Sequence, residues 1–330
     1  MSELFEPRPS FLIVDGHALI YRAYHALTMI TDAEGQPAGA FYGFLRILLS
    51  VLDQVQPECW LIAFDDPAPT KRQLKYPFYK ANRPPMPEDL IPQVDKIHQG
   101  VAKLGAPIRQ IPGIEADDII GTISREVSER SQASVLILTG DRDSFQLVDD
   151  NVHVLVPNTG RARRGSKQDA LTEYNPARVK QKMSVEPSQI VDFKALAGDP
   201  SDNIPGVKGI GAKTASTLLA QFGDLDHIYL AIDQDNVDTI RSSVVAKLIN
   251  DRENAYISRE LAQIDRYVTD IDFDYEHCRI VNYDKQEVSD FLLHYGFKSL
   301  LKYLPADDFD TGLQAALFQQ QNYCSKTAKV

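Results

Sequence analysis

The sequence predicts an α/β protein with a mostly parallel central sheet and flanking helices. Four short runs of β-branched or apolar residues have the composition of buried parallel strands, and they cover residues 11–14, 59–64, 134–139 and 153–156. Helical patterns separate the first three runs, and a weaker run at residues 107–111 is a candidate fifth strand. This alternation of strands and helices favours a sheet with helices on its faces.

Acidic residues follow the predicted strands at one strand end after another. They are Asp15 after the first run, Asp65 and Asp66 after the second, Glu115, Asp117 and Asp118 after the weak run, and Asp141 and Asp143 after residues 134–139. Sites in open α/β sheets form beyond the carboxyl ends of the strands, so we expect these carboxylates to converge on one edge.

The stretch GIEADDIIG, residues 113–121, illustrates the alternative that such acids cap helices. Ile120, Ile123 and Val127 have helical spacing, so an amphipathic helix is predicted to begin here. Acids in a first helical turn stabilise the helix by about 0.3–1 kcal/mol each. Capping explains one or two of the acids, whereas their repetition at four strand ends favours a shared site.

Clustered carboxylates repel one another, so such a cleft requires bound cations. Asp199 and Asp202 in the later stretch GDPSDN join the candidate set. All-oxygen ligands suit Mg²⁺ or Mn²⁺, and the chain has neither the spacing of a zinc site nor an EF-hand loop. Two such cations about 4 Å apart activate water and stabilise the leaving oxygen in phosphodiester cleavage.

The segment from Pro67 to Pro92 has a different composition from its surroundings. Seven prolines lie among basic and aromatic residues, so no continuous long helix can form. The basic residues are Lys71, Arg72, Lys75, Lys80 and Arg83, and the aromatic residues are Tyr76, Phe78 and Tyr79. A long excursion of this composition suits a single nucleic-acid strand, and an irregular surface loop is the alternative.

The second half of the chain has mainly helical patterns. A helix is predicted over residues 187–198, and residues 291–304 form a helix pair or a bent helix. In GVKGIGAKTA, Gly209 and Gly211 allow a tight turn before a helix, next to Lys208, Lys213 and Thr214. Amides at that helix start can hold a phosphate without reading base sequence, although a simple helix-connecting turn is the alternative. From residue 306 onward no clear pattern remains, and a flexible tail is expected.

The overall composition indicates a soluble, cytoplasmic protein in a reducing compartment. No run approaches the roughly 20 apolar residues of a membrane span, and the start of the chain lacks a signal core. The three cysteines are widely separated. The seven histidines are scattered, and only His17 lies beside a candidate acid. The net charge of −11 argues against a nucleic-acid partner. The basic side chains, however, are clustered in residues 71–83 and in Arg161, Arg163, Arg164 and Lys167.

These motifs, taken in order, resemble the 5′-nuclease domain of bacterial DNA polymerase I and its flap endonuclease relatives. The resemblance spans residues 10–305 and rests on seven stretches: VDGHALIYRAYHAL, FD, YPFYKANRPPMPEDL, PGIEADDIIGT, LTGDRDSFQLV, ALAGDPSDNIPGVKGIGAKTA and FKSLLKYL. It implies a PIN-like core, a helical arch and a helix-hairpin-helix subdomain. It also implies cleavage of 5′ flaps, nicked or gapped duplexes and RNA primers, in replication and repair.

The resemblance implies a role for each matching residue. The metal ligands would be Asp15, Asp65, Glu115, Asp117, Asp118, Asp141, Asp143, Asp199 and Asp202, and the phosphate contacts would be Lys80, Arg83 and Arg22. Further DNA contacts would come from Arg72, Tyr79, Gly209, Gly211, Lys213 and Thr214, with K⁺ at the helix-hairpin-helix. Mg²⁺ is the expected cofactor and Mn²⁺ a substitute.

The expected organisation is a nuclease core over residues 1–185 with the arch at 67–95, a helical DNA-binding subdomain over 186–305, and the tail over 306–330. The sequence ends about 25 residues after FKSLLKYL, so it contains no polymerase domain, and we expect a monomer that is either a standalone nuclease linked to a separate polymerase or a fragment. Two departures from the family pattern are Lys71, where many relatives have an aromatic residue, and the basic stretch NTGRARRGSKQD.

Three rival functions remain for comparison. A silent junction-binding relative would lack some of the acids, and all of them are present here. A toxin-like ribonuclease would be much shorter and without GVKGIGAKTA. A phosphatase of the haloacid dehalogenase type would carry a second Asp two residues after Asp15, where this chain has His17.

Overall fold

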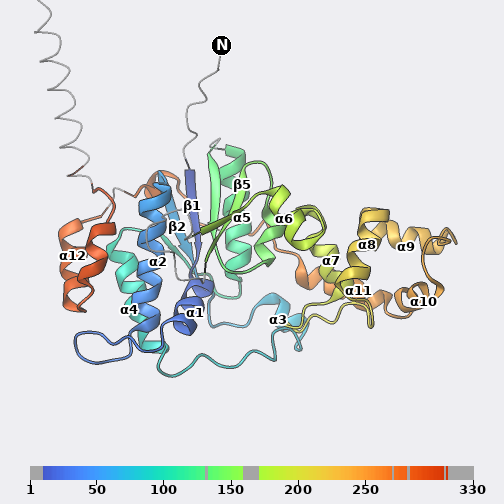
Figure 1. Cartoon of the computed structure of the whole chain (residues 1–330), viewed down its shortest axis with the longest axis horizontal. Coiled ribbons are helices and arrows are strands. Elements are labelled where there is room, and N and C mark those ends of the chain that lie inside the picture. The colour runs from blue at the N-terminus through green and yellow to red at the C-terminus, as the bar shows by residue number, and fades with distance from the viewer. Residues whose placement is uncertain are drawn as a thin grey trace, which may run out of the picture.

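The computed structural model describes residues 10–130, 133–158, 171–269, 271–280, 283–307 and 310. Within these residues one six-stranded sheet has the order β3-β2-β1-β4-β5-β6 (Figure 1). The basic cluster at 161–167, Cys324 and nearly all of the predicted tail lie outside the described residues.

The four predicted strands are confirmed as β1 (Ser10–Asp15), β2 (Cys59–Ala63), β4 (Ser134–Leu138) and β5 (Val152–Pro157). The weak run is reduced to β3 (Ile108–Arg109). All of these strands pair in parallel, whereas β6 (Leu171–Tyr174) is antiparallel to β5. No local pattern in the sequence predicts β6, because its four residues are at most half-buried and form no apolar run.

The side chains of β1 alternate between two hydrophobic cores. Phe11 and Ile13 pack with α5 (Ala116–Arg130), while Leu12 and Val14 pack with α1 (Gly16–Ala26), α2 (Gly39–Val55) and α4 (Ile91–Lys103). Successive side chains of a strand point to opposite faces, so one strand serves both cores. The sheet is therefore the middle of three layers, as predicted.

The C-terminal half is helical and extends beyond one side of the sheet (Figure 1). Its elements are α6 (Pro176–Met183), α7 (Ile190–Ala197), α8 (Ala212–Phe222), α9 (Leu225–Asp233), α10 (Ser242–Asn250) and α11 (Arg252–Ala262). The chain then returns, and α12 (Lys285–His294) packs on the same core as α2 and α4. The predicted helix pair is confirmed, since α12 is followed by Gly296 at φ 82° and by a 3₁₀ helix at Lys298–Tyr303.

Residues 67–90, called the arch segment below, connect β2 to α4. The segment contains one short helix, α3 (Lys71–Lys75), which begins with a capping box between Thr70 and Gln73. After α3 the backbone forms turns and extended stretches up to α4. The arch is therefore helical only at α3, because its prolines interrupt backbone hydrogen bonding, and this shortens the helical arch that the family resemblance implied.

No helix among the described residues is both long enough and apolar enough to cross a membrane.

Candidate active site

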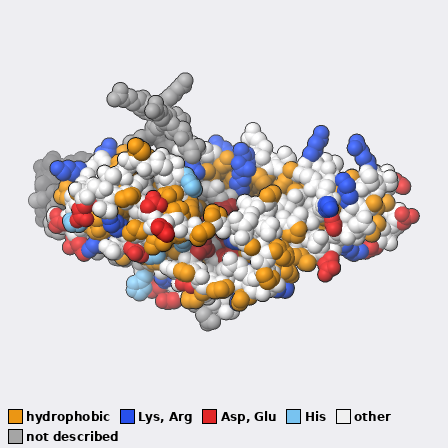
Figure 2. Space-filling model, turned by 90° about the horizontal axis from the view of Figure 1, so that it is seen from below, with side chains coloured by type: hydrophobic (Ala, Val, Ile, Leu, Met, Phe, Trp, Pro, Cys, Tyr) orange, Lys and Arg blue, Asp and Glu red, His pale blue; other side chains and the backbone are white. Residues whose placement is uncertain are grey.

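The acidic residues converge at the point where the direction of strand order reverses. From β1 the sheet is extended by β2 and β3 on one side, and β4 then pairs on the other side of β1. Such a switch point opens a crevice at the carboxyl ends of the two central strands. Figure 2 shows the molecule from this side, with acidic side chains at a hollow near the middle.

Asp15, the last residue of β1, occupies the centre of this crevice. Its side chain is buried and accepts hydrogen bonds from Thr139 Oγ1 at 2.7 Å and from the backbone N–H of Ala18 at 3.0 Å. Burial raises its pKa to about 7, and repulsion from Asp65 and Asp141 acts in the same direction. A raised pKa at a buried carboxylate indicates a group that gains strongly from a nearby cation.

Asp65 is positioned next to Asp15 by close packing behind both residues. Gly16 lies so near Phe64 that a Cβ at residue 16 would be 2.2 Å from Cε1 of that ring. His17 Nδ1 accepts the backbone N–H of Asp65 at 3.1 Å, and burial lowers the pKa of His17, which keeps this nitrogen unprotonated. Asp65 Oδ1 in turn accepts the backbone N–H of Ala116 at 2.8 Å, which ties the site to α5.

Asp141 and Asp143 are placed by a chain of hydrogen bonds that follows β4. Thr139 Oγ1 accepts the backbone N–H of Asp141 at 3.0 Å, and Asp141 Oδ1 accepts that of Asp143 at 2.9 Å. Burial and repulsion from Asp141 raise the pKa of Asp143 to about 7. Burial, followed by repulsion from Asp141 and Asp15, raises the pKa of Asp117 well above its ordinary value. These carboxylates therefore share one electrostatic environment.

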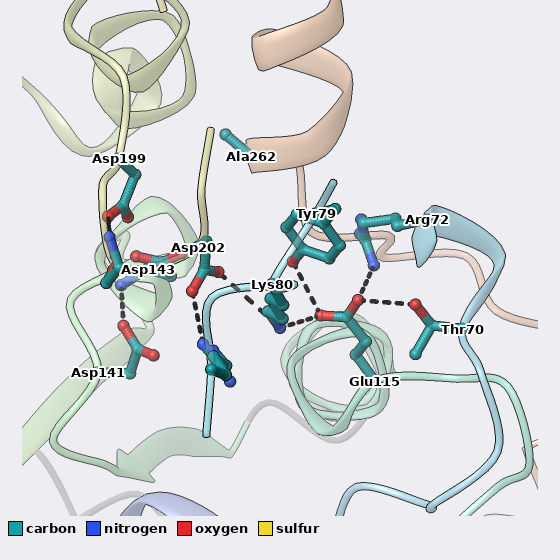
Figure 3. Close-up of polar contacts among 12 residues, drawn as sticks. Thr70, Arg72, Tyr79, Lys80, Glu115, Asp141, Asp143, Asp199, Asp202 and Ala262 are labelled. Atoms are coloured by element: carbon teal, nitrogen blue, oxygen red, sulfur yellow. Dashed lines mark hydrogen bonds and ion pairs between the residues drawn. The ribbon is translucent and has the colours of Figure 1, made fainter. Parts of the chain in front are cut away.

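Glu115 forms the opposite wall of the site and is held by the arch segment (Figure 3). Thr70 Oγ1 donates to its Oε1 and Tyr79 donates to its Oε2, both at 3.2 Å. Lys80 Nζ lies 2.6 Å from Oε2, and Arg72 lies 3.5 Å from Oε1. Burial by itself would raise the pKa of Glu115, but attraction to Lys80 and Arg72 lowers it. Glu115 is thus an ionised carboxylate between two cations.

The arch segment also docks on the loop that carries Asp202. Lys80 has a positive φ of 56°, and its backbone N–H donates to the Asp202 carbonyl at 2.9 Å. Arg83 donates to Asp202 Oδ1 at 2.5 Å, and the Asn203 side chain donates to the Phe78 carbonyl at 2.8 Å. Lys80 and Arg83 therefore face the carboxylates, and their contact with a phosphate stays a prediction.

Lys194 is a member of the site that the sequence analysis missed. Its ammonium group is buried in α7, forms an ion pair with Asp143, and lies 2.6 Å from Asp199. Burial by itself would lower its pKa, yet both carboxylates raise it, and attraction to Lys194 lowers the pKa of Asp199. A lysine in the mostly apolar stretch IVDFKALA, where Asp192 is the one other charged residue, was the available signal.

Three other predicted residues lie differently from the expectation. Asp118 accepts hydrogen bonds from both Nη groups of Arg72, at 2.7 and 2.8 Å, and from the backbone N–H of Asp265 at 2.8 Å. Because it follows Asp117 on a helix, its side chain faces Arg72, whose Nη1 also lies 3.5 Å from Glu115. Arg72 is fully engaged by this carboxylate and by a backbone carbonyl at Gln263. The Tyr79 ring is buried, so in this structure it supports Glu115 and is not presented for base stacking.

Arg22 lies on α1, close to the loop after β4. Its guanidinium donates to the carbonyl of Pro157 at the end of β5. A Cβ at Gly140 would lie 3.4 Å from Arg22 Nη1, so Arg22 is next to the residue that precedes Asp141. The structure thus brings Arg22 to the border of the carboxylate site.

The predicted helix-hairpin-helix is formed by α7, a glycine turn and α8. Gly209 has a φ of 81°, which disfavours any other residue there, and its carbonyl accepts from Lys247 Nζ at 2.9 Å. Gly211 is the N-cap of α8 and offers no side chain to the first amides of that helix. Lys213 is exposed and Thr214 half-buried in the first turn. The amides at the start of α8 and the ammonium group of Lys213 can together bind a phosphate.

The donor chemistry fits a divalent cation, although the ligands are not assembled. Among the residues that the structure describes, no three carboxylate, imidazole or thiol side chains form a ready-made ligand set for one ion. Lys80, Arg83 and Lys194 instead partner Glu115, Asp202, Asp143 and Asp199. Mg²⁺ takes one or two carboxylates and keeps several waters, so the buried Asp15 and the half-buried Asp117, Asp141 and Asp143 offer suitable oxygen ligands.

Fold and site together define an α/β nuclease with its carboxylates at the carboxyl edge of a parallel sheet. The family model of the 5′-3′ exonuclease N-terminal, resolvase-like domain matches residues 10–184, and that of the C-terminal SAM fold of the same family matches residues 185–286. The chain belongs to the 5′-3′ exonuclease family, which confirms the resemblance inferred from the sequence motifs.

Bacterial DNA polymerases I are among the proteins to which the chain is similar. The chain is 37% identical to DNA polymerase I of Caldicellulosiruptor bescii over 297 residues, which are 89% of this chain and 33% of that protein. It is 42% identical to DNA polymerase I of Pseudomonas aeruginosa over 268 residues, 80% of this chain and 28% of the relative. The chain therefore spans about a third of the length of the relatives it matches.

Solved structures with the same fold come from more distant proteins. The T5 D15 protein co-crystallised with metal ions has a TM-score of 0.62 at 22% identity, over 90% of this chain and all of that one. The catalytic core of Rad2 in complex with DNA has a TM-score of 0.54 at 14% identity, over 91% and 92% of the two chains. These likenesses support the PIN-like arrangement of sheet and helices.

Proposed function

We propose that the chain is a Mg²⁺-dependent, structure-specific 5′ nuclease. It hydrolyses phosphodiester bonds at 5′ flaps, nicked or gapped duplexes and RNA primers, during DNA replication and repair. The observation that carries this proposal is the gathering of buried and half-buried carboxylates, with raised pKa values at Asp15, Asp117 and Asp143, beneath the cations of the arch segment. Membership of the 5′-3′ exonuclease family supports it.

Each group in the site has a role in this proposal. The carboxylates of Asp15, Asp117, Asp141 and Asp143 would hold the divalent cations, and Asp65, Glu115, Asp199 and Asp202 would complete the acidic surroundings. When bound, Mg²⁺ would activate water and neutralise charge on the phosphate. Lys80 and Arg83 exchange their carboxylate partners for the scissile phosphate and stabilise its developing negative charge. Arg22 contributes a further phosphate contact.

The helical half supplies duplex binding. The glycine turn at residues 206–211 and the start of α8 hold a phosphate of the duplex backbone, and K⁺ binds at the helix-hairpin-helix. We assign the nuclease core to residues 1–185 and the DNA-binding subdomain to 186–305. The DNA complex of Rad2 and the metal-bound T5 protein support the choice of substrate and of cofactor class. A monomer in the cytoplasm, linked functionally to a DNA polymerase, completes the proposal.

Mapping the cut sites tests the proposed function. The protein is incubated with 5′-flap, nicked and single-stranded DNA, labelled at either end, with Mg²⁺ or with EDTA. We expect cleavage near the junction only with Mg²⁺ and little cleavage of the single strand. Cleavage in EDTA would refute the metal mechanism, and equal cleavage of all three substrates would refute structure specificity.

Asp141→Asn tests the assignment of the site. We expect this variant to lose cleavage while it retains binding of the flap substrate in EDTA, because the substitution removes a metal ligand and keeps the shape of the side chain. Asp150→Asn, at an exposed residue outside the site, is the matched control. Cleavage by Asp141→Asn at the rate of the wild type would remove this carboxylate from the mechanism.

A further inference from the structure

A large pocket lies on the side of the arch segment that faces away from the carboxylate crevice. Its volume is about 670 Å³, and its walls are α3, the start of α5, the end of α11 and residues 263–267. This volume is within the range of small-molecule and nucleotide sites. None of the roles assigned above uses the pocket.

Two tyrosine rings line the wall of the pocket that is opposite α3. Tyr267 is 70% exposed, and the guanidinium of Arg125 lies 4.4 Å from its ring centroid. Tyr256 is 37% exposed, its hydroxyl donates to Asp226, and its ring stacks on Tyr229. Both rings are held in place by these neighbours, so little side-chain entropy is lost when a planar ligand stacks on them.

The charges in the pocket favour an anion, in a protein whose net charge is −11. Of its three acids, Asp118 is paired with Arg72 and Glu260 with Lys75, while Asp265 accepts a hydrogen bond from the backbone N–H of Tyr267 at 2.8 Å. Lys71 and Arg266, in contrast, form no ion pair with any residue that the structure describes. The Nε of Arg266 is buried and has no hydrogen-bond partner, which is costly unless a ligand supplies an acceptor.

The pocket is separated from the carboxylate crevice by a single pair of side chains. Arg72 lines the pocket and lies 3.5 Å from Glu115, whose other oxygen is 2.6 Å from Lys80 in the crevice. The pocket therefore adjoins the crevice across the side chains of Arg72 and Glu115. Stacking rings beside unpaired cations are the features that bind single-stranded nucleic acid.

We propose that this pocket binds unpaired nucleotides of the 5′ strand next to the cleavage site, by stacking a base on Tyr267 or Tyr256 and by pairing a phosphate with Lys71 and Arg266. Lys71 stands where many relatives have an aromatic residue, and here the rings come from the opposite wall. The proposal rests on the proposed nuclease function and specifies how the protein recognises a flap.

The test compares binding of two fluorescent substrates in EDTA: a duplex with a long 5′ flap and the same duplex with a nick. We expect Tyr267→Ala and Arg266→Gln each to weaken binding of the flap about tenfold, as stacking and phosphate contacts do, and to leave the nick unchanged. Tyr267→Phe keeps the ring and should bind as the wild type does. An abasic flap should make the wild type and Tyr267→Ala equal, because no base remains to stack.

Each outcome decides the proposal. Unchanged flap binding in both variants overturns it, and so does an equal loss on the flap and on the nick. Thermal unfolding of the variants confirms that they fold, which the exposure of Tyr267 favours. Cleavage with Mg²⁺ distinguishes failure of the proposed function from failure of the pocket proposal. A wild type that cuts neither substrate overturns the proposed function. A wild type that cuts both substrates, together with a Tyr267→Ala variant that binds the flap as the wild type does, overturns only the role of the pocket.

Discussion

Replacing the buried ammonium group of Lys194 tests whether cations hold the carboxylate site together. The Lys194 side chain is 8% exposed, and its partners Asp143 and Asp199 are 14% and 16% exposed. Lys194→Met keeps the length of the side chain and removes its charge, which leaves two buried carboxylates without their cation. Loss of one partner of a buried ion pair costs about 3–5 kcal/mol.

We therefore expect Lys194→Met to unfold roughly 5–10 °C below the wild type when no divalent metal is present. Mg²⁺ should restore more of that loss in the variant than it adds to the wild type, because the added cation replaces the missing charge. Thermal unfolding followed by circular dichroism, with and without Mg²⁺, measures both effects. Lys180→Met is the control, since the pair of Lys180 with Glu186 is exposed and contributes less than about 1 kcal/mol.

Two results would refute this reasoning. One is a metal-free Lys194→Met protein that unfolds at the temperature of the wild type, which would show that Asp143 and Asp199 do not depend on the ammonium group. The other is an equal effect of Mg²⁺ on the wild type and the variant, which would place the added cation away from these carboxylates.

Three further predictions concern protons, packing and the glycine turn. The pKa values of Asp15 and Asp143 are raised to about 7 in the folded, metal-free protein. Between about pH 4 and about pH 7 the folded protein therefore binds more protons than the unfolded chain, so these two groups make the free energy of unfolding fall as the pH rises. Mg²⁺ competes with those protons, so its effect on Tm should be larger at about pH 8 than at about pH 6, and equal shifts would contradict this. Gly16→Ala should destabilise the protein by about 1–3 kcal/mol, measured by thermal unfolding, because its Cβ would meet the ring of Phe64; an unchanged Tm would show that the ring moves freely. Gly209→Ala should weaken duplex binding severalfold in an EDTA titration, because φ is 81° there, while an unaltered affinity would exclude the turn from the DNA interface.

Much of the fold followed from local patterns along the chain. Strands β1 and β2 are apolar runs buried along nearly their whole length, as central strands of a parallel sheet require, whereas β4 and β5 are mostly apolar with half-buried positions such as His153. The edge strand β6 has no such run, and the arch segment kept a single five-residue helix among its prolines. Strands of the hydrophobic core were therefore predictable from their own apolar residues. The edge strand and the arch segment carry no such local pattern, so their conformations were not predictable from the sequence.

The sequence by itself determined that acids follow the strands and that parallel strands bring their carboxyl ends to one edge, which was enough to locate the site. The tertiary structure decided which way each side chain faces. Adjacent residues on a helix point about 100° apart, so the packing of α5 turns Asp117 toward Asp15 and Asp118 toward Arg72. Lys194 enters the site because α7 packs against the 3₁₀ helix at Asp143–Leu147, which is a contact between residues far apart in the sequence.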